Sequence, residues 1–393
     1  MKTSLDGNVM IYSNAPTTPT GYGRQVNQIV TQMKKHGLRV SVACNFGQED
    51  GIGKFETGFG DVDLYPKSYT GYSLDMLGNN FRHFTDKTKS PSMLMTLFDV
   101  WVMHGQPDLD NFEIHSITPI DHLKIVPMVA QWLQKPNVRP IAMSQDGQQQ
   151  MAEVGIEAPL IPHTVDRTIF KPGQKIDGST GRKFLGVKDD EFVFGIVAAN
   201  KANKYIHRKA FAELLLAFAM HVKKHPKSKL YLHTEHTSQL GGFDLVRLLK
   251  VAGVPPESVI FPDNLRLRYG FTDEEMSAIY EGIDCLLAPS YGEGFQVPLI
   301  ESMSVGTRVI ASNYTAPKDI VASDCWRVDG QPLWDEISGS FFSVPNIGQI
   351  ITAMGQATES RKKSTTCIQR ADEFAIEKVF EEKWLPYLSE NLK

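Results

Sequence analysis

The sequence predicts an α/β protein built on parallel β-sheets, and three observations support this fold class. Short apolar runs of strand length recur along the whole chain. Several are followed by stretches with apolar residues at helical spacing, and glycines stand at many of the turns between them. The 393 residues are enough for two domains of usual size, and 41% hydrophobic with 22% charged residues is typical of globular proteins.

The stretch 283–312 predicts one complete βαβ unit. Two apolar runs of strand length at its ends enclose a glycine-bearing loop and a short helix. Pro298 fits the first turn of this helix, and Gly306 fits its end. In a parallel sheet such a loop lies at the carboxyl edge of the strands, which is where open α/β sheets bind ligands.

Two glycines and two glutamates give this unit its predicted chemistry. Gly292 and Gly294 let the backbone approach a ligand closely, and the N–H groups that open the next helix can hold a phosphate. Glu293 and Glu301 would repel a phosphate, so we expect them to accept hydrogen bonds from hydroxyl groups. A ligand with a phosphate and several hydroxyls is a sugar nucleotide. An isolated pair of this kind is more often two solvated acids, so the surrounding pattern decides.

That surrounding pattern resembles the E-x7-E signature of retaining GT-B glycosyltransferases of family four (glycosyl transferases group 1). It reads Ser290-x-x-Glu293-Gly294-Phe295-x-x-Pro298-x-x-Glu301-x-Met303-x-x-Gly306, and it continues into Val309-Ile310-Ala311-Ser312. The resemblance is strong over residues 190–320, moderate over 93–172 and weak over 8–40. It implies the GT-B architecture, in which two Rossmann-like domains have parallel sheets that face each other across a cleft.

In the first half of the chain, apolar runs predict strands at 9–12, 38–43, 93–98, 114–120 and 140–144. Helical spacing predicts helices at 26–33 and 123–133, whereas residues 44–90 give no clear elements. Gly21-Tyr22-Gly23 precedes the first helix, and Val26 in the third glycine position breaks the dinucleotide-binding fingerprint. The resemblance implies a loop that closes over the donor phosphates; a plain β–α turn is the alternative.

Asp121 and His122 follow the predicted strand 114–120 and should lie at the same sheet edge as a ligand. A histidine there can donate to a sugar hydroxyl or steady charge at the reacting carbon, although a structural histidine is an equal alternative. The resembling family usually has His followed by Asp. Because the order here is reversed, the sequence leaves open which side chain faces the sugar.

The segment Pro162-His163-Thr164-Val165-Asp166, followed by Phe170 and Pro172, resembles the family's hinge between domains. We therefore expect an amino-terminal, acceptor-side domain at 1–172 and a carboxy-terminal, nucleotide-sugar-binding domain at 173–367. The amphipathic stretch 368–393 is expected to form a helix that crosses back onto the first domain.

In the second half, strands are predicted at 191–199, 229–232 and 259–262, and helices at 211–222 and 272–280. The second of these helices opens with a cap signature at Thr272-Asp273-Glu274-Glu275. Arg208 and Lys209 precede the first of these helices, where the helix dipole disfavours cations unless an anion binds. The resemblance implies that they grip the donor's diphosphate.

The sequence departs from the family's pattern at two positions near these cations. Ala210 stands in a glycine position, and Asn200 stands where an arginine commonly ends the preceding strand. Lys201 or Lys204 is expected to compensate for the missing cation.

Together these assignments imply a catalytic group of Glu293, Lys209, Arg208, His122 and Asp121. The donor site is expected to comprise Gly21, Tyr22, Gly23, Asn200, His233, Thr234, Pro262, Tyr291, Gly292, Gly294, Phe295, Gln296, Val297 and Glu301. The chain has no Asp-x-Asp metal motif, so we expect no metal and no cofactor besides the nucleotide-sugar co-substrate.

Composition limits the partners and the compartment. A formal charge of −4 gives no general electrostatic reason to bind nucleic acid or an anionic membrane. The four cysteines are scattered without a C-x-x-C pair, which indicates free thiols in a reducing compartment. Neither a signal peptide nor a membrane-spanning run is evident, and we expect a cytoplasmic protein.

The function implied by the resemblance is transfer of a hexose, with retention, from a nucleotide-diphosphate sugar to a hydroxyl acceptor. UDP-glucose is the first expectation for the donor and GDP-mannose the second; the acceptor is a glycan, lipid, small molecule or modified nucleic acid. A glycosyltransferase acting on modified nucleic acid and a non-catalytic sugar-nucleotide-binding protein are the alternatives. A phosphorylase-like enzyme would need a pyridoxal phosphate lysine and a far longer chain.

Overall fold

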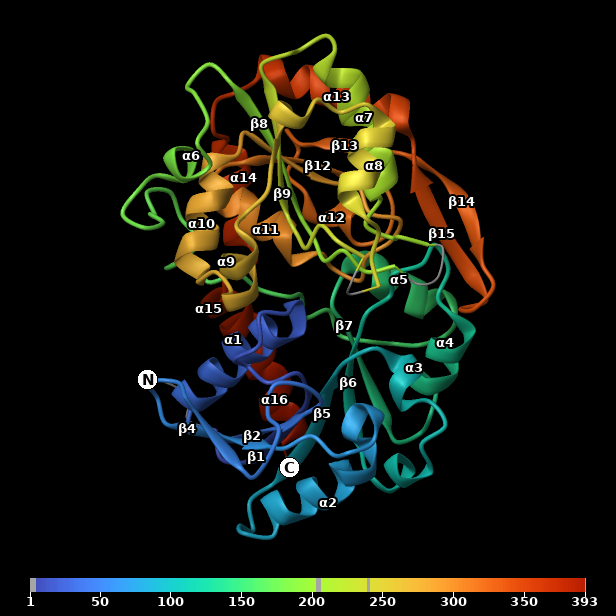
Figure 1. The fold of residues 1–393 in the computed structure, drawn as a ribbon. Helices are drawn as coiled ribbons and strands as arrows, with labels where there is room; N and C mark the ends of the chain where they lie inside the picture. The colour runs from blue at the N-terminus through green and yellow to red at the C-terminus, as the bar shows by residue number, and fades with distance from the viewer. Residues whose placement is uncertain (1–4, 203–205, 239–240, 393) are drawn as a thin grey trace.

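The computed structural model describes residues 5–202, 206–238 and 241–392, and Figure 1 shows two sheet-containing domains stacked on one another. In this part of the chain the first sheet has seven strands in the order β3-β4-β2-β1-β5-β6-β7. All its neighbouring strands are parallel except β3 and β4. Its strands are β1 (Asn8–Ser13), β2 (Arg39–Cys44), β3 (Gly53–Glu56), β4 (Asp61–Tyr65), β5 (Ser92–Leu97), β6 (Ile114–Thr118) and β7 (Val138–Ala142). The helices of this domain are α1 (Gly21–Lys35), α2 (Leu74–Thr85), α3 (Val100–Met103), α4 (Pro127–Leu133) and α5 (Gln145–Glu153).

The second sheet, within the same described residues, has six strands in the order β10-β9-β8-β11-β12-β13, and every neighbouring pair is parallel. Its strands are β8 (Phe192–Val197), β9 (Ser228–His233), β10 (Val259–Ile260), β11 (Cys285–Ala288), β12 (Arg308–Ser312) and β13 (Trp326–Val328). Its helices are α6 (Gly181–Phe184), α7 (Phe211–Val222), α8 (Leu245–Ala252), α9 (Asn264–Tyr269), α10 (Asp273–Gly282), α11 (Val297–Ser304), α12 (Pro317–Ile320) and α13 (Ile347–Glu359). A separate antiparallel hairpin, β14 (Gly330–Asp335) and β15 (Ser340–Pro345), follows β13.

The structure confirms the predicted central unit as β11, α11 and β12. The two strands pair in parallel, and Leu286, Leu287, Val309 and Ile310 are at most 1% exposed. The predicted helix cap is also confirmed and is a capping box, because the Thr272 hydroxyl and the Glu275 carboxylate each accept a hydrogen bond from the other's backbone N–H. These local signals were accurate because they depend on few neighbours in the chain.

Two predicted helices differ from the structure. The helix expected from Leu123 begins only at Pro127, since proline is favoured in a first helical turn and disfavours helical geometry in the residue before it. The tail is not one continuous helix. It divides into α14 (Thr365–Asp372), α15 (Ile376–Val379), a π-helical turn (Phe380–Trp384) and α16 (Leu385–Asn391).

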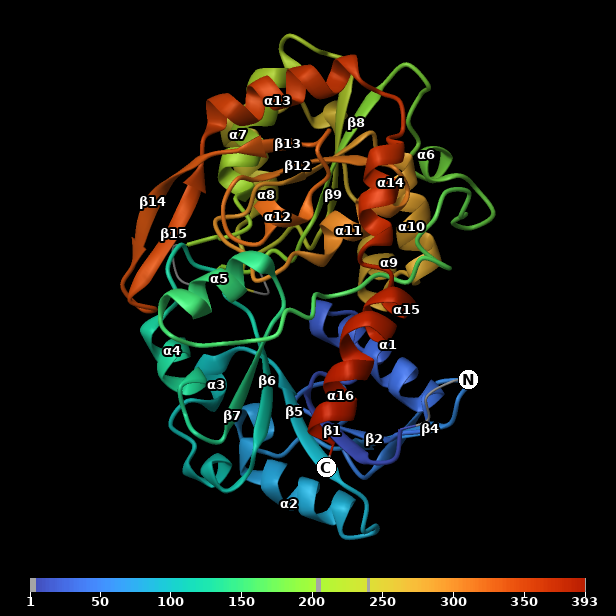
Figure 2. The same ribbon diagram turned by 180° about the vertical axis from the view of Figure 1, so that it is seen from behind.

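The tail lies across both domains, as Figure 2 shows from behind. The ring of His36 stacks on Phe380 at 4.8 Å, and the Tyr387 hydroxyl lies 2.6 Å from Nδ1 of His115. The chain first passes from one domain to the other in the segment 162–172. Gln25 of α1 holds this segment, because its side-chain amide exchanges two hydrogen bonds of 2.8 Å with the backbone of Thr164. No helix in the described part of the chain is both long enough and apolar enough to span a bilayer.

His163 gives the fold a specific acid sensitivity. It is 7% exposed and packs edge-on against Phe295, and burial lowers its pKa to about 3. The unfolded chain takes up a proton below about pH 6.5, but the folded chain does not until near pH 3, so acid favours unfolding in this window. We expect His163→Leu to reduce the loss of stability between pH 6.5 and 5 by about 2 kcal/mol in urea titrations.

Urea titrations of the unaltered protein at the same pH values provide the reference. An unaltered pH dependence in the His163 variant would contradict the proposed effect of its burial.

Candidate functional site

The loop after β11 lies directly against the loop after β6, so the two domains meet at the predicted site. A Cβ atom added to Gly292 would stand 1.9 Å from the carbonyl oxygen of Asp121. One added to Gly294 would stand 2.8 Å from the Cα atom of Pro119. Since no side chain fits at these distances, both glycines are required by close approach of the domains, in addition to any contact with a ligand.

Glu293 is held between two cations from the segment that links β8 to α7, and β8 is the neighbouring strand of β11. Its Oε2 atom lies 2.8 Å from Arg208, and its Oε1 atom bonds the Lys209 ammonium. Glu293 is only 5% exposed, and burial by itself would raise its pKa. The charges of Lys209 and Arg208 outweigh burial and lower the pKa of Glu293 to about 2. This carboxylate is therefore ionised at neutral pH.

Arg208 and Lys209 are placed by the turn that opens α7. The Arg208 side chain is 40% exposed and that of Lys209 is 20% exposed, so both cations remain accessible. Burial and the neighbouring Arg208 charge lower the pKa of Lys209. Ala210 caps α7 in the left-handed conformation at φ 56°, which is strained for alanine and free for glycine. This geometry explains why a glycine at this position would suit the turn.

Glu301 lies on α11, eight residues after Glu293, and is 3% exposed. Its Oε1 atom lies 2.9 Å from the Arg24 guanidinium, and its Oε2 atom accepts a hydrogen bond of 2.7 Å from Tyr280. Arg24 belongs to α1 of the first domain and also pairs with Asp273 at 3.3 Å. Burial raises the pKa of Glu301, and the Arg24 charge offsets part of this effect. Arg24 thus joins the two domains at one of the predicted donor-binding residues.

Asp121 and His122 have different surroundings. The two side chains are hydrogen-bonded, with Nδ1 of His122 2.7 Å from Oδ1 of Asp121. His122 is 5% exposed because its ring stacks on Phe342 at 4.0 Å. The Asp121 side chain is 29% exposed and lies near enough to Arg208 for their charges to interact. Asp121, and not His122, therefore faces the space beside Glu293.

The charge on Asp121 is maintained by its neighbours. Burial alone would raise the pKa of Asp121, but the hydrogen bond and charge of His122, together with Arg208, lower it.

Gly21, Tyr22 and Gly23 form the first turn of α1 and not a loop ahead of it. Thr20 caps this helix by accepting a hydrogen bond of 3.0 Å from the Gly23 N–H. Tyr22 directs its hydroxyl to Asp99, 3.1 Å away, and packs on Phe98. The glycine stretch therefore presents a helix N-terminus and an aromatic ring next to the loop that ends β5.

Several predicted donor residues lie around the start of α11 and the end of β9. Gln296, which precedes α11, has a left-handed conformation at φ 83°, and Val297 begins the helix. Such strain is often found at functional positions. Thr234 is 4% exposed, and its hydroxyl has no hydrogen-bond partner among the residues that the structure describes, as is also true of the Oε1 atom of Gln296. Both atoms are buried polar groups without a partner, which is unusual inside a folded protein.

Other predicted donor residues are engaged within the protein. The Tyr291 hydroxyl bonds Glu213 at 2.7 Å, and Nδ1 of His233 bonds the Tyr231 hydroxyl at 2.7 Å. Phe295 packs its ring between His163 and Phe374, so only its backbone is directed to the site. Pro262 is buried just after β10.

Asn200 has a structural role that the sequence did not predict. Its Nδ2 atom donates to the carbonyls of Glu235, Thr237 and Phe243, and its Oδ1 atom accepts from the Phe243 N–H and lies 2.8 Å from Nε2 of His207. This network occupies the whole amide and ties two loops together. We therefore remove Asn200 from the donor-binding group. Lys201 is exposed in the adjacent loop, and Lys204 lies outside the described residues.

Sequence reasoning missed Arg24, Tyr280 and Asp335 as neighbours of the predicted site residues. Arg24 and Tyr280 bond Glu301, and Asp335 lies 3.5 Å from His122. Their partners are distant in the chain, so no local spacing indicates them. Arg24 stands directly after the glycine stretch, which is the one signal that could have drawn attention to it.

Asp324, Cys325 and Cys367 form the one group of His, Cys, Asp or Glu side chains, among the described residues, whose ligand atoms are close enough to share a metal. The Arg308 Nε atom lies 3.0 Å from Asp324 and disfavours a cation there. No predicted site residue belongs to this group, and the expectation of a metal-independent site stays a prediction.

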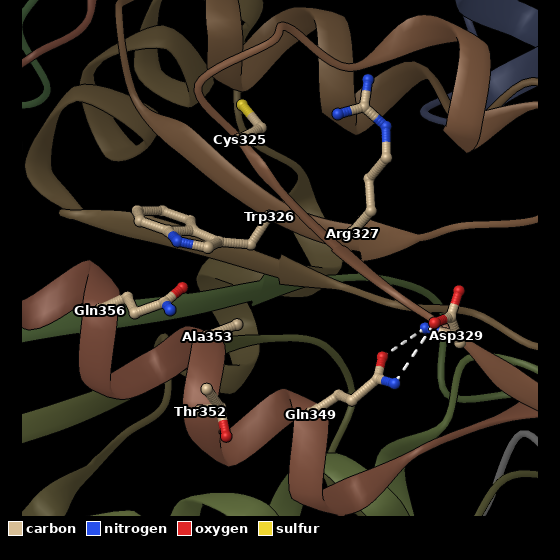
Figure 3. Close-up of a pocket in the computed structure, with 8 residues that line it drawn as sticks. All are labelled: Cys325, Trp326, Arg327, Asp329, Gln349, Thr352, Ala353 and Gln356. Atoms are coloured by element: carbon tan, nitrogen blue, oxygen red, sulfur yellow. Dashed lines mark hydrogen bonds between the residues drawn. The ribbon is translucent and has the colours of Figure 1, made fainter.

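A shallow surface hollow lies elsewhere, between β13 and α13 (Figure 3). Asp329 and Gln349 are hydrogen-bonded along one side of it, through Asp329 N–H and Gln349 Oε1 at 2.8 Å. It is lined by Cys325, Trp326, Arg327, Asp329, Gln349, Thr352, Ala353 and Gln356. None of these residues is part of the predicted site.

Solved structures with the same arrangement define the class of fold. Sucrose-phosphate synthase of Thermosynechococcus elongatus matches with a TM-score of 0.74 at 16% identity, covering 98% of each chain. HepE of Anabaena, solved with UDP and glucose, matches with a TM-score of 0.68 at 14% identity, covering 98% of this chain and 99% of its own. The predicted GT-B fold is therefore confirmed.

The carboxy-terminal domain is similar to one family of glycosyltransferases. The family model of glycosyl transferases group 1 matches residues 195–334, which include Arg208, Lys209, Glu293 and Glu301. This region, about a third of the chain, is similar to that family, and the resemblance predicted from the sequence is confirmed there. A curated relative, the MMP alpha-(1->4)-mannosyltransferase of Mycolicibacterium hassiacum, is 36% identical over 71 residues, which are 18% of this chain and 17% of that protein.

The corrected role of Asn200 can be tested by stability. Asn200→Ala removes the hydrogen bonds of a 3%-exposed amide and leaves partly buried backbone groups without these partners. We expect the free energy of unfolding to fall by about 2–3 kcal/mol, measured by urea denaturation. Asn313→Ala, at an exposed amide bonded to Asp329, is the control and should cost less than about 1 kcal/mol. Equal stability of the two variants would contradict the structural role.

Proposed function

We propose that this protein transfers a hexose from a nucleoside-diphosphate sugar to a hydroxyl acceptor, with retention at the anomeric carbon. The observation that carries the proposal is the Glu293 carboxylate held by Arg208 and Lys209 at the edge of the second sheet. Two accessible cations beside one carboxylate leave positive charge for a diphosphate. Such preorganised charge stabilises a leaving group more effectively than water does.

The proposed reaction needs no separate protein base. The bond between the anomeric carbon and the diphosphate oxygen breaks, and the bond to the acceptor oxygen forms on the same face. The acceptor's hydroxyl proton passes to the departing diphosphate oxygen. Arg208 and Lys209 offset the charge on that oxygen, while Glu293, ionised at neutral pH, accepts hydrogen bonds from the sugar. Asp121 holds another sugar hydroxyl from across the domain contact.

The donor is proposed to lie along α11, with its ribose hydroxyls at Glu301. In this structure Arg24 and Tyr280 occupy the two oxygens of that carboxylate. A ribose would therefore replace or share the Arg24 contact. The Thr234 hydroxyl and the Gln296 Oε1 atom have no hydrogen-bond partner among the described residues, and we propose that they contact the nucleotide.

UDP-glucose is the proposed donor, and GDP-mannose is the second choice. Support for the first comes from HepE of Anabaena, solved with UDP-glucose and matching with a TM-score of 0.69 at 13% identity. The trehalose-6-phosphate structure from E. coli with UDP-2-fluoro glucose, at a TM-score of 0.64 and 12% identity, points the same way. The mannosyltransferase relative over 71 residues supports the second.

The proposed compartment is the cytoplasm. The four cysteines are all buried and free, and the Sγ atoms of Cys325 and Cys367 lie 3.5 Å apart without a bond. This arrangement suits a reducing environment.

Donor binding is tested by thermal shift with UDP-glucose, GDP-mannose and UDP. A ligand that binds the native state at a hundred times its dissociation constant stabilises it by about 2.7 kcal/mol, so the proposed donor should raise the melting temperature by several degrees. UDP-glucose should give a larger shift than GDP-mannose. No shift with any of these nucleotides would overturn the proposal.

Turnover is tested by UDP release from UDP-glucose with water as the acceptor. Lys209→Gln should lower this rate by about 100-fold, because it removes a charge that faces the leaving diphosphate. Lys224→Gln, at an exposed position beyond the other end of α7, should leave the rate unchanged. We also expect no loss of rate with EDTA, because Arg208 and Lys209 supply the positive charge. Full activity of the Lys209 variant would refute the assigned role.

A further inference from the structure

The β14–β15 hairpin extends from the second domain to the first, as both views of the ribbon show (Figures 1 and 2). Two hydrogen bonds attach it to the segment after β6. The Leu123 N–H donates to the Phe341 carbonyl at 2.8 Å, and the Ser340 hydroxyl donates to the Lys124 carbonyl at 2.6 Å. The hairpin therefore holds the segment that carries Asp121 and His122.

The same hairpin is attached to the Glu293 loop. The Ser343 N–H donates to the Tyr291 carbonyl at 2.9 Å, and the Tyr314 hydroxyl donates to the Ser343 carbonyl at 2.8 Å. One antiparallel ribbon thus contacts both loops that form the proposed site. A change in the position of the hairpin can therefore alter both loops through these hydrogen bonds, while the two sheets keep their positions.

Asp335, at the end of β14, directs a carboxylate at His122. Its Oδ2 atom lies 3.5 Å from Nε2 of His122, and its side chain is 4% exposed. Its Oδ1 atom accepts a hydrogen bond of 3.3 Å from the Ile337 N–H, which fixes the carboxylate in the hairpin turn. On the other side of the imidazole, Nδ1 faces Asp121 at 2.7 Å. His122 therefore lies between a carboxylate from each domain, with Phe342 stacked on its ring.

An imidazole with a carboxylate at each nitrogen can satisfy both only by donating from both. The contact at Nε2 therefore sets the orientation of the ring and of its Nδ1–H group. The hydrogen bond from Nδ1 in turn sets the direction of the Asp121 carboxylate. Phe342 excludes water from the ring, which strengthens this dependence.

We propose that Asp335 is a positioning residue, delivered to the site by the β14–β15 hairpin, that orients Asp121 through His122. The role in turnover rests on the proposed glycosyl transfer, whereas the coupling of Asp335 to His122 does not. Asp335 does not touch the sugar in this arrangement. Loss of the Asp335 carboxylate should lower kcat, because the Asp121 carboxylate would then point in a different direction. The nucleotide end of the site along α11 would be unchanged.

The first test compares Asp335→Asn with Glu336→Gln. The asparagine keeps the Oδ1 acceptor for the turn and removes the charge that faces His122. We expect kcat for UDP release from UDP-glucose to fall about ten-fold with little change in KM. Glu336 is the next residue of the hairpin, but it is exposed and bonds Trp334, so its variant should keep the wild-type kcat. Equal behaviour of the two variants would overturn the proposal.

The second test asks whether Asp335 acts through Asp121. In an Asp121→Asn background the additional Asp335→Asn change should lower kcat no further, because the group that it orients has already been altered. A purely structural role for the hairpin would reduce kcat by the same factor in both backgrounds, and that result would refute the inference. Melting temperatures of all variants separate loss of fold from loss of positioning.

The third test needs no turnover and therefore separates this inference from the proposed function. In protein labelled with ¹⁵N-histidine, the ring signals of His122 are assigned by their loss in His122→Gln. Asp335→Asn should shift both ring nitrogen signals of His122, and Glu336→Gln should shift neither. Unchanged His122 signals in Asp335→Asn would overturn the coupling. If UDP-glucose releases no UDP but these signals shift, the proposed function fails while the coupling stands.

Discussion

The ion pairs of Glu293 with Arg208 and Lys209 are the interactions on which the rest of the site depends. A carboxylate that is 5% exposed is stable only with compensating charge, and the two cations at the start of α7 provide it. These ion pairs also hold the loop after β11 against the start of α7 within the second domain. The left-handed turn at Ala210 and the strained Gln296 are local costs of this arrangement.

Contact between the domains is the second constraint, and it follows from the first. With Glu293 fixed, Gly292 and Gly294 lie against Asp121 and Pro119, where no side chain would fit. Arg24 reaches from α1 to Glu301 across the same contact. The carboxyl edges of the two sheets therefore face each other with their polar groups paired. A nucleotide sugar would exchange these internal pairs for its own phosphates and hydroxyls.

The sequence was informative wherever one short stretch determines the structure. The β11–α11–β12 unit and the helix cap at Thr272 and Glu275 depend on close neighbours and appear as predicted. The sequence did not predict contacts between residues that are far apart in the chain. The amide of Asn200 is used by a loop 35 to 43 residues away, and the orientation of His122 depends on Phe342 and Asp335 from the other domain. Such contacts leave no periodic signal, so the reversed order of Asp121 and His122 could be interpreted only in three dimensions.

The position of the hairpin has a mechanical consequence. The tail helices α15 and α16 lie at one end of the domain contact and the β14–β15 hairpin at the other (Figures 1 and 2). If the domains rotate about the end where the chain crosses, the hairpin end travels farthest. Its attachment to the first domain includes two hydrogen bonds to the backbone, each worth about 1 kcal/mol net. Because these bonds must break before the gap widens, the hairpin acts as a latch on the end of the domain contact that lies opposite the chain crossings.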